Sequence, residues 1–316
     1  MTGLTGAWVF YKFGNALGTS DVPKRRSSHK RSVPKGGGIG ILAAFIFCAI
    51  SFDLDKSFWI PTVLLSVVSF VGDRSEIRPM VRLIIQCGCS LVFLANVLAP
   101  MQMGFKFFAL LGFLSIFIVG TANVYNFMDG IDGIAGITGI VGYFLLAFYS
   151  YIVGYDDSYG VLCIALAFAC LGFLCFNLPH AKVFLGDVGS ILLGSVFACL
   201  MITLSDNVTD FMIMAGFLMG FYFDEIFTVV IRVRSGDPLI TPHRKHIYQL
   251  LANELAVSHW KIAFLYGVVQ LCVGLSAIYA GLTNLFFLLL VYLLYCFLFT
   301  VVAVKVHQKI GFIHIQ

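Results

Sequence analysis

Apolar runs separated by short polar stretches cover nearly the whole chain and set its predicted architecture. About twenty apolar residues in a helix cross the hydrocarbon core of a bilayer, and most of the runs approach that length. The pattern predicts about ten membrane-spanning helices, at residues 38–52, 57–71, 83–99, 104–122, 134–155, 159–178, 189–204, 211–231, 260–280 and 284–304. The earlier run at residues 4–18 is too short to span, so we expect a truncated first span and a native reading frame that begins upstream of Met1.

Composition supports the same architecture. The chain is 60% hydrophobic and 11% charged, and it contains 32 phenylalanines. A soluble globular domain does not bury that much apolar surface. We therefore predict an all-α polytopic membrane protein in which residues 1–316 form a single integral membrane domain. All nine cysteines lie in apolar runs and show no metal-binding or disulfide pattern, which is typical of small buried side chains.

The distribution of positive charge orients the predicted spans. When the crossings are counted, seventeen of the twenty Lys and Arg residues fall on one face, Lys56 and Lys106 fall on the other, and Lys12 is ambiguous. The positive-inside rule makes the rich face cytoplasmic. Because the polar motifs described next lie on that face, the sequence predicts an active site on the cytoplasmic side.

Residues 123–133, NVYNFMDGIDG, place four polar side chains between two apolar runs. These side chains recur at every third position: Asn123, Asn126, Asp129 and Asp132. A straight helix would spread them over several faces, but Gly130 and Gly133 favour a bend or a 3₁₀-like turn in which they converge. Their oxygen atoms suit Mg²⁺ bound together with substrate phosphates. A polar loop with a helix-capping Asn or Asp is the alternative interpretation.

The basic loop at residues 21–38 ends in three glycines. The positive-inside rule alone accounts for its charge. His29 lies among serines, however, and the glycines at residues 36–38 open the next run. Free backbone N–H groups at a helix start, with cations beside them, form a phosphate site. Both interpretations remain open from the sequence.

Two further carboxylates lie at the ends of predicted spans. Asp73 is followed directly by Arg74, and one interpretation of this pair is an interfacial salt bridge. Asp187 lies between Gly186 and Gly189 just before a span. At that position an aspartate is suited to cap the helix, to bind a metal, or to do both.

The longest cytoplasmic loop contains a cluster of basic and imidazole groups. His243, Arg244 and His246 lie in DPLITPHRKHIYQLL, residues 237–251. Hydrogen-bond donors of this kind suit phosphate or sugar oxygens. The same stretch is also compatible with an amphipathic segment at the membrane interface.

Two acidic residues lie inside an apolar run. Asp224 and Glu225 are about two turns from its cytoplasmic end, and Arg232 is a candidate partner for Asp224. A secondary transporter with intramembrane acids is therefore the competing function. Transport predicts polar groups near the bilayer midplane, whereas most of the polar groups here lie at span ends on one face. The pattern favours an enzyme.

Taken together, four motifs resemble the polyprenyl-phosphate N-acetylhexosamine-1-phosphate transferases. These are bacterial relatives of the muramoyl-pentapeptide phosphotransferase that start O-antigen and other cell-envelope glycans. The resemblance covers almost the whole chain and rests on DVPKRRSSHKRSVPKGGG, NVYNFMDGIDGIAG, KVFLGDVGS and PHRKHIYQLL, in this order. The SSH and HRKHIYQ loops are more similar to the O-antigen branch than to the peptidoglycan branch.

The resemblance implies a reaction and a set of partners. In that family a lipid phosphate attacks the β-phosphorus of a UDP-sugar, UMP leaves, and Mg²⁺ or Mn²⁺ is required. The implied partners are a UDP-N-acetylamino sugar, undecaprenyl or another polyprenyl phosphate, and the bilayer of the bacterial inner membrane, with no nucleic acid. A homodimer remains an open alternative.

The resemblance and the motifs together give three groups of candidate residues. The catalytic candidates are Asp73, Asp129 and Asp132. The metal candidates are Asp187, which matches the family's metal-binding aspartate, and Asn126. The substrate-binding candidates are His29, Asn123, Asn126, Lys182, His243, Arg244 and His246.

One position departs from the family pattern. The family usually has adjacent aspartates where this chain has Gly72 and Asp73, so a single carboxylate remains. A lipid phosphate has a second pKa of about 6 and is largely dianionic at cytoplasmic pH, so it needs no strong base. We therefore expect one carboxylate to suffice, with Asp73 positioning the attacking phosphate or a metal-bound water.

Overall fold

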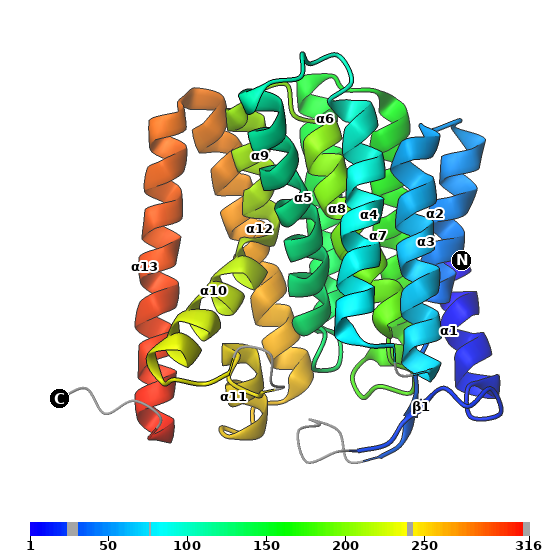
Figure 1. The fold of residues 1–316 in the computed structure, drawn as a ribbon. Helices are drawn as coiled ribbons and strands as arrows, with labels where there is room; N and C mark the ends of the chain where they lie inside the picture. Colours follow the sequence, from blue (N-terminus) through cyan, green and yellow to red (C-terminus); the bar gives the residue numbers. More distant parts are fainter. Residues whose placement is uncertain (24–30, 76, 239–242, 312–316) are drawn as a thin grey trace.

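The computed structural model describes residues 1–23, 31–75, 77–238 and 243–311. Helices dominate this part of the chain (Figure 1). They are α1 (Thr2–Phe13), α2 (Ile39–Ser51), α3 (Lys56–Arg74), α4 (Pro79–Val97), α5 (Phe105–Phe127), α6 (Ile134–Val153), α7 (Asp157–Asn177), α8 (Asp187–Thr203), α9 (Val208–Ala215), η1 (Gly216–Leu218), α10 (Met219–Arg234), α11 (Ile247–Asn253), α12 (His259–Thr283) and α13 (Leu285–Ile310). Strands β1 (Ser20–Asp21) and β2 (Val33–Pro34) pair antiparallel.

The predicted all-α polytopic architecture is confirmed. Each of the ten apolar runs coincides with a helix, and the eighth run forms α9, η1 and α10 together. Within the described ranges, seven helical stretches are long and apolar enough to cross a membrane: α4, α5, α6, α7, the unit from α9 to α10, α12 and α13. Helices α2 and α8 have 13 and 17 residues, which makes them about 20 and 26 Å long and shorter than the hydrocarbon core.

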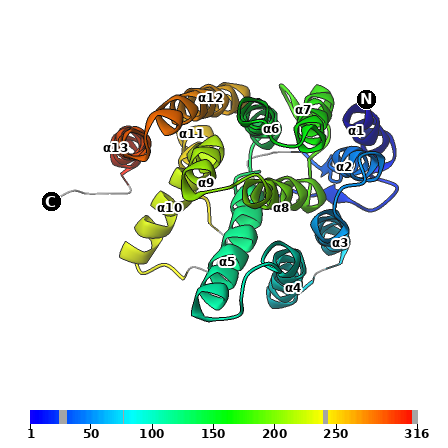
Figure 2. The same ribbon diagram turned by 90° about the horizontal axis from the view of Figure 1, so that it is seen from above.

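Helix α8 lies at the centre of the bundle, with α2, α3, α5, α6 and α7 around it (Figure 2). Every residue from Val188 to Ile202 is buried. A helix that is apolar on all sides is suited to such a position, because none of its faces needs water. The first turn of α8 is therefore fixed by neighbours on several sides.

Two extended segments explain why α2 and α8 are short. The backbone at residues 35–38 runs parallel to residues 184 and 185: the N–H groups of Gly36 and Gly37 donate to the carbonyl of Phe184, and Gly38 donates to Leu185. Non-helical backbone is tolerated at membrane depth only where protein satisfies its polar groups. The two segments satisfy each other and lead directly into α2 and α8.

The span from α9 to α10 is interrupted. A 3₁₀ turn at residues 216–218 separates the two helices, and α10 then leans away from the bundle towards the lower part of α13 (Figure 1). A glycine begins this turn, and kinks of this type commonly occur at glycine. As a result, α10 and α11 lie at the lower end of the view, together with the α5–α6 and α7–α8 loops and the strands. We call this end the site end.

Four of the helices that begin at the opposite end carry their own caps, whereas α5 begins after Gly104 without a side-chain cap. In each of the four, the side chain of the N-cap residue accepts a hydrogen bond from the backbone N–H two residues later. This bond supplies a missing partner in the first turn. These caps are Asp55 for α3, Asp156 for α7, Asn207 for α9 and Asn284 for α13.

Helices α6, α8 and α11 begin at the site end and have no side-chain cap from their own N-cap residue. Side chains from distant parts of the chain accept these hydrogen bonds instead. The contacts are Gly133 N to Asn177 Oδ1 at 2.6 Å, Asp187 N to Asp73 Oδ2 at 2.9 Å and Ile247 N to Asp224 Oδ1 at 2.8 Å. Polar side chains are thus drawn together at this end by helix capping itself.

The contact between Gly38 and Gly189 gives a first testable prediction. A Cβ atom on Gly38 would lie 2.4 Å from the Gly189 Cα atom, so Gly38→Ala must push α2 and α8 apart. We expect it to lower the thermal midpoint, with a loss of stability of about 1–3 kcal/mol. Gly88→Ala is the matched control, because nothing lies within 4 Å of a Cβ there. Equal midpoints for both variants in detergent would show that the contact is not tight.

Candidate active site

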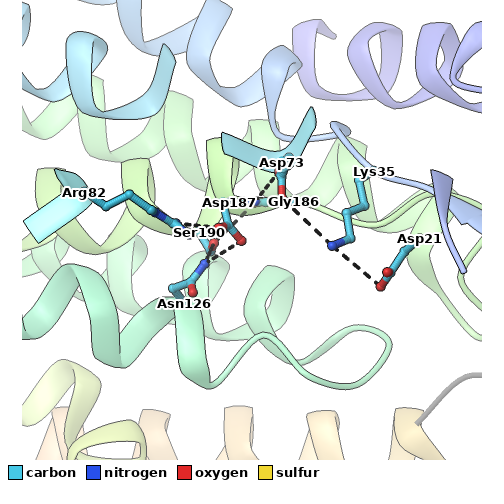
Figure 3. A network of polar contacts seen from close by, with 8 residues as sticks. All are labelled: Asp21, Lys35, Asp73, Arg82, Asn126, Gly186, Asp187 and Ser190. Atoms are coloured by element: carbon cyan, nitrogen blue, oxygen red, sulfur yellow. Dashed lines mark hydrogen bonds and ion pairs between the residues drawn. The ribbon is translucent and has the colours of Figure 1, made fainter. Parts of the chain in front are cut away.

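The first turn of α8 holds the central carboxylate of the site. Asp187 is the first helical residue, and Gly186 before it has φ +75°. Asn126 Nδ2 of α5 lies 3.0 Å from Asp187 Oδ1, and the guanidinium of Arg82 on α4 pairs with Asp187 Oδ2 (Figure 3). Asn126 Nδ2 also donates to Ser190 Oγ at 2.8 Å. Three helices thus hold one carboxylate that remains about one quarter exposed.

Asp73 approaches the same turn from α3. Its largely buried carboxylate accepts the Asp187 N–H, and the Lys35 Nζ atom lies 3.9 Å from its Oδ1 atom (Figure 3). Lys35 also lies 3.6 Å from Asp21 Oδ2 of β1. A Cβ atom on Gly186 would lie 3.0 Å from Asp73 Oδ2. Because glycine has no Cβ atom, the carboxylate can approach the backbone here. The two predicted acidic residues, 114 positions apart, are therefore joined.

The stretch from residue 123 to residue 133 brings only part of its polar set to this cluster. Helix α5 continues to Phe127, so both asparagines are helical and the aspartates lie in the loop that follows. Asn126 reaches Asp187, but Asn123 Nδ2 donates to Gln86 Oε1 of α4 at 2.8 Å. Asp132 Oδ2 lies 3.1 Å from His259 Nδ1 of α12. The expectation that all four side chains converge is therefore wrong.

Asp129 is half-buried in the loop after α5. Burial raises the pKa of its carboxyl well above the usual range, and the negative charge of Asp187 raises it further, while Lys35 acts in the opposite direction. The negative charge of Asp73 also raises the pKa of the Asp129 carboxyl. The Asp129 carboxyl therefore holds its proton more readily than a carboxyl in water.

Residues 243–246, which we call the histidine loop, lie at the site end but form a separate group. His243 is half-buried, and burial, with the nearby His246 next in importance, lowers the pKa of its imidazole to about 4, so it is neutral at physiological pH. Arg244 is half-buried, whereas only 2% of His246 is exposed. Lys182 is exposed on the α7–α8 loop. His29 lies outside the described residues.

Three sequence-based interpretations are corrected by this geometry. Asp187 is not an N-cap, because Gly186 occupies that position. The glycines at residues 36–38 do not offer free N–H groups to a phosphate, because these groups donate to carbonyls of the α7–α8 loop. Arg74 lies over the Phe70 ring, 4.5 Å from its centroid, while Asp73 turns towards α8.

Four residues of the site were not predicted: Lys35, Arg82, Ser190 and His259. Lys35 and Arg82 belong to the cationic set that the positive-inside rule had already explained, so nothing separated them from topology signals. Ser190 lies one helical turn after Gly186 and completes the FLGDVGS motif. His259 is the first residue of α12. A histidine at the start of a predicted span did not by itself indicate that it belongs to a site.

The donor set of the cluster fits an open cation site. In the described ranges, no three His, Cys, Asp or Glu side chains gather closely enough to enclose a metal ion. Mg²⁺ does not need such an enclosure, because it is commonly held by one or two carboxylates together with waters and substrate phosphates. Asp187, with the Asp73 carboxylate hydrogen-bonded to its backbone N–H, meets that requirement, whereas zinc would call for His or Cys ligands.

Comparison with known proteins finds relatives among the lipid-linked sugar-phosphate transferases. An undecaprenyl-phosphate alpha-N-acetylglucosaminyl 1-phosphate transferase of Thermotoga maritima is 28% identical over 278 residues, which are 87% of this chain and 85% of that protein. Phospho-N-acetylmuramoyl-pentapeptide-transferases are also similar. The one from Staphylococcus saprophyticus is 35% identical over 172 residues, 52% of each chain, and one from Staphylococcus aureus is 32% identical over 192 residues, 59% of this chain and 55% of that one.

The alignments with the two staphylococcal transferases thus cover only about half of their length. The Thermotoga relative is matched over most of its length. Residues 56–205 match the model of glycosyl transferase family 4. The matched segment is just under half of the chain and contains Asp73, Asn126 and Asp187.

Proposed function

We propose that this enzyme transfers an N-acetylamino-sugar-1-phosphate from a UDP-sugar to a polyprenyl phosphate and releases UMP. The observation that carries the proposal is the cluster at the first turn of α8, where Asp187, Asp73, Asn126 and Arg82 meet inside the segment that matches the family. The Thermotoga relative is named for the same class of reaction on undecaprenyl phosphate. The product would be the lipid-linked sugar that starts a cell-envelope glycan, with O-antigen as the expected pathway.

The reaction is a phosphoryl transfer with a balanced exchange of bonds. An oxygen of the lipid phosphate forms a bond to the β-phosphorus of the UDP-sugar, and the bond from that phosphorus to the bridging oxygen of UMP breaks. The lipid phosphate, with a second pKa of about 6, arrives largely deprotonated, and UMP leaves as an anion. No obligatory proton transfer remains, so positioning and charge stabilisation should dominate catalysis.

The residues of the cluster divide this work. Lys35 and Arg82 supply positive charge beside the carboxylates, and Arg82 can exchange its pairing with Asp187 for contact with a phosphate. Asn126 donates to Asp187 through its amide nitrogen, so it orients that carboxylate. Asp73 holds the backbone of the same turn and faces Lys35, a position suited to orienting the attacking phosphate.

A divalent cation, Mg²⁺ or Mn²⁺, completes the proposal. Asp187 would hold it, with Asn126 as a supporting ligand and Asp129 in the adjoining loop, and the cation would offset the charge of the diphosphate. Asp129, Asp132 and Asn123 remain candidates around the nucleotide. His243 and Arg244 remain candidates for the sugar nucleotide, because both are half-buried donors in the loop before α11.

The proposed location is the bacterial inner membrane with the site end in the cytoplasm. The site end includes the loops that hold most of the Lys and Arg residues of the sequence, which favours that orientation. A UDP-sugar is a cytoplasmic substrate, so the two assignments agree. The alternative of a secondary transporter is weaker, because the acid Asp224 is completely buried and accepts the first N–H group of α11.

The products test the bond assignment. Purified protein with undecaprenyl phosphate, a UDP-N-acetylamino sugar and Mg²⁺ should release UMP, and release should stop when EDTA replaces the cation. Chromatography of the nucleotide products distinguishes the outcomes. Release of UDP would place bond cleavage at the sugar carbon and contradict the proposal.

Asp187→Asn tests the metal candidate. The amide keeps the shape of the carboxylate but loses its charge, so we expect kcat to fall by at least about 100-fold. The loss of charge at the helix N-terminus should change stability by only about 1 kcal/mol. Asp156→Asn is the matched control, because Asp156 caps α7 at the opposite end and accepts the Ser158 N–H at 2.9 Å. Full turnover in Asp187→Asn would remove this residue from the mechanism.

Asp73 and Gly72 test whether one carboxylate suffices. Asp73→Asn can still accept the Asp187 N–H, yet it loses the charge that faces Lys35, so kcat should fall by about 100-fold with UDP-sugar binding retained. Gly72→Asp should leave turnover unchanged or raise it modestly. The atoms nearest to a Cβ on Gly72 belong to the Ile77 side chain and lie 3.6 Å or more away, so a β-carbon fits there. An active Asp73→Asn enzyme would exclude Asp73 from catalysis.

A further inference from the structure

A second polar cluster lies where α10, α11 and α12 meet, apart from the turn that holds Asp187. Asp224 of α10 is completely buried. Its carboxylate accepts hydrogen bonds from Ile247 N at 2.8 Å, Tyr248 N at 3.3 Å and the Tyr266 hydroxyl at 2.6 Å. Because the first two donors are the first N–H groups of α11, a carboxylate from another span caps this helix.

The same cluster encloses His246. Its Nδ1 atom lies 3.5 Å from Asp224 Oδ1, and its Nε2 atom lies 3.6 Å from Glu225 Oε2. The ring stacks on Tyr248 with centroids 5.6 Å apart, and it lies 5.0 Å from the ring of His243. His246 therefore faces protein on both sides, and the half-buried His243 next to it is the more accessible imidazole of the pair.

Helix α11 also touches the acidic loop of the active site. The Tyr248 hydroxyl donates to the Phe127 carbonyl at the end of α5, at 2.8 Å. A Cβ atom on Gly130 would lie 2.2 Å from the same hydroxyl, so the loop passes directly against Tyr248. Asp129 lies between these two contact points in the sequence. Any shift of α11 is thus transmitted both to the histidine loop and to the loop of Asp129.

We propose that Asp224 is a positioning residue for the transfer reaction. By capping α11, its carboxylate fixes the distance between the histidine loop, which would contact the sugar nucleotide, and the Asp129 loop, which would contact the diphosphate. Burying a carboxylate is expensive unless hydrogen bonds surround it, and Asp224 meets that condition at the start of α11. This inference rests on the proposed function and adds a residue that touches no substrate.

Asp224→Asn is the main test. The amide matches the carboxylate in shape, but its nitrogen must face donors, so α11 should loosen without a change in volume. We expect the KM for the UDP-sugar to rise at least about tenfold, with the KM for polyprenyl phosphate within about twofold of the wild-type value. Hydrogen exchange at the amides of residues 247 and 248 should accelerate. A purely structural role would lower the amount of active enzyme and leave both KM values unchanged.

A milder variant and a matched control complete the design. Tyr266→Phe removes one donor to Asp224 and keeps the ring, so it should shift the UDP-sugar KM in the same direction by about threefold, even if Asp224→Asn fails to fold. Asp210→Asn is the control. Asp210 is also a buried carboxylate with several donors, Tyr149, Tyr155 and Asn207, but it lies on α9 at the opposite end. It should lower stability without a selective change in KM.

The outcomes separate this inference from the proposed function. A selective rise in UDP-sugar KM in Asp224→Asn and Tyr266→Phe, absent in Asp210→Asn, supports the positioning role. Wild-type enzyme that releases UMP, with Asp224→Asn and Tyr266→Phe showing unchanged KM values, overturns the inference alone. Wild-type protein that releases no UMP overturns the proposed function. In that case, unchanged hydrogen exchange at α11 in Asp224→Asn would also overturn the cap itself.

Discussion

The need to satisfy backbone N–H groups at the site end organises this protein. Four helices that begin at the opposite end are capped by the side chain of the residue just before them, as Asp55 and Asp156 show. Helices α6, α8 and α11 depend instead on side chains from distant segments. A helix N-terminus in a low-dielectric environment attracts negative charge, so this arrangement draws Asp73 and Asp224 into the interior. The need for hydrogen-bond acceptors at these helix N-termini therefore places carboxylates at the end of the bundle where an anionic substrate is expected to react.

The charge of the site follows from this arrangement. Burial and then the negative charges of Asp187 and Asp73 raise the pKa of the Asp129 carboxyl, and Lys35 and Arg82 lie beside Asp73 and Asp187 as the cations of the cluster. A divalent cation that binds with a diphosphate would offset negative charge of the carboxylates. Under the proposed function, the charges of the cluster would be balanced only when substrate and cation are present. The extended segments at residues 35–38 and 184–186 make this possible, because they carry Lys35 and Gly186 inside the bundle and still satisfy their own backbone.

The helices and several of the site residues could be predicted from the sequence, but the contacts between those residues could not. Apolar runs specify spans because their length and polarity are local properties, and the ten predicted runs are helical. The contact of Asp73 with Asp187 depends on how α3 packs beside α8, which no local pattern encodes. The same is true of Asp132, whose partner His259 lies on another helix. The predicted phosphate site at residues 36–38 was wrong for the same reason. The N–H groups of these residues donate to carbonyl groups of the α7–α8 loop, a contact between distant segments.

The most direct test of this account is whether a cation bound at Asp187 also binds the substrate phosphates. Electron paramagnetic resonance of Mn²⁺ reports this through its coupling to ³¹P, and it needs no turnover. With purified protein and a UDP-sugar, the account predicts a protein-bound Mn²⁺ signal with ³¹P coupling, which should be lost in Asp187→Asn while Asp156→Asn retains it. The same ³¹P-coupled, protein-bound signal in Asp187→Asn would show that the cation binds elsewhere and would contradict the account.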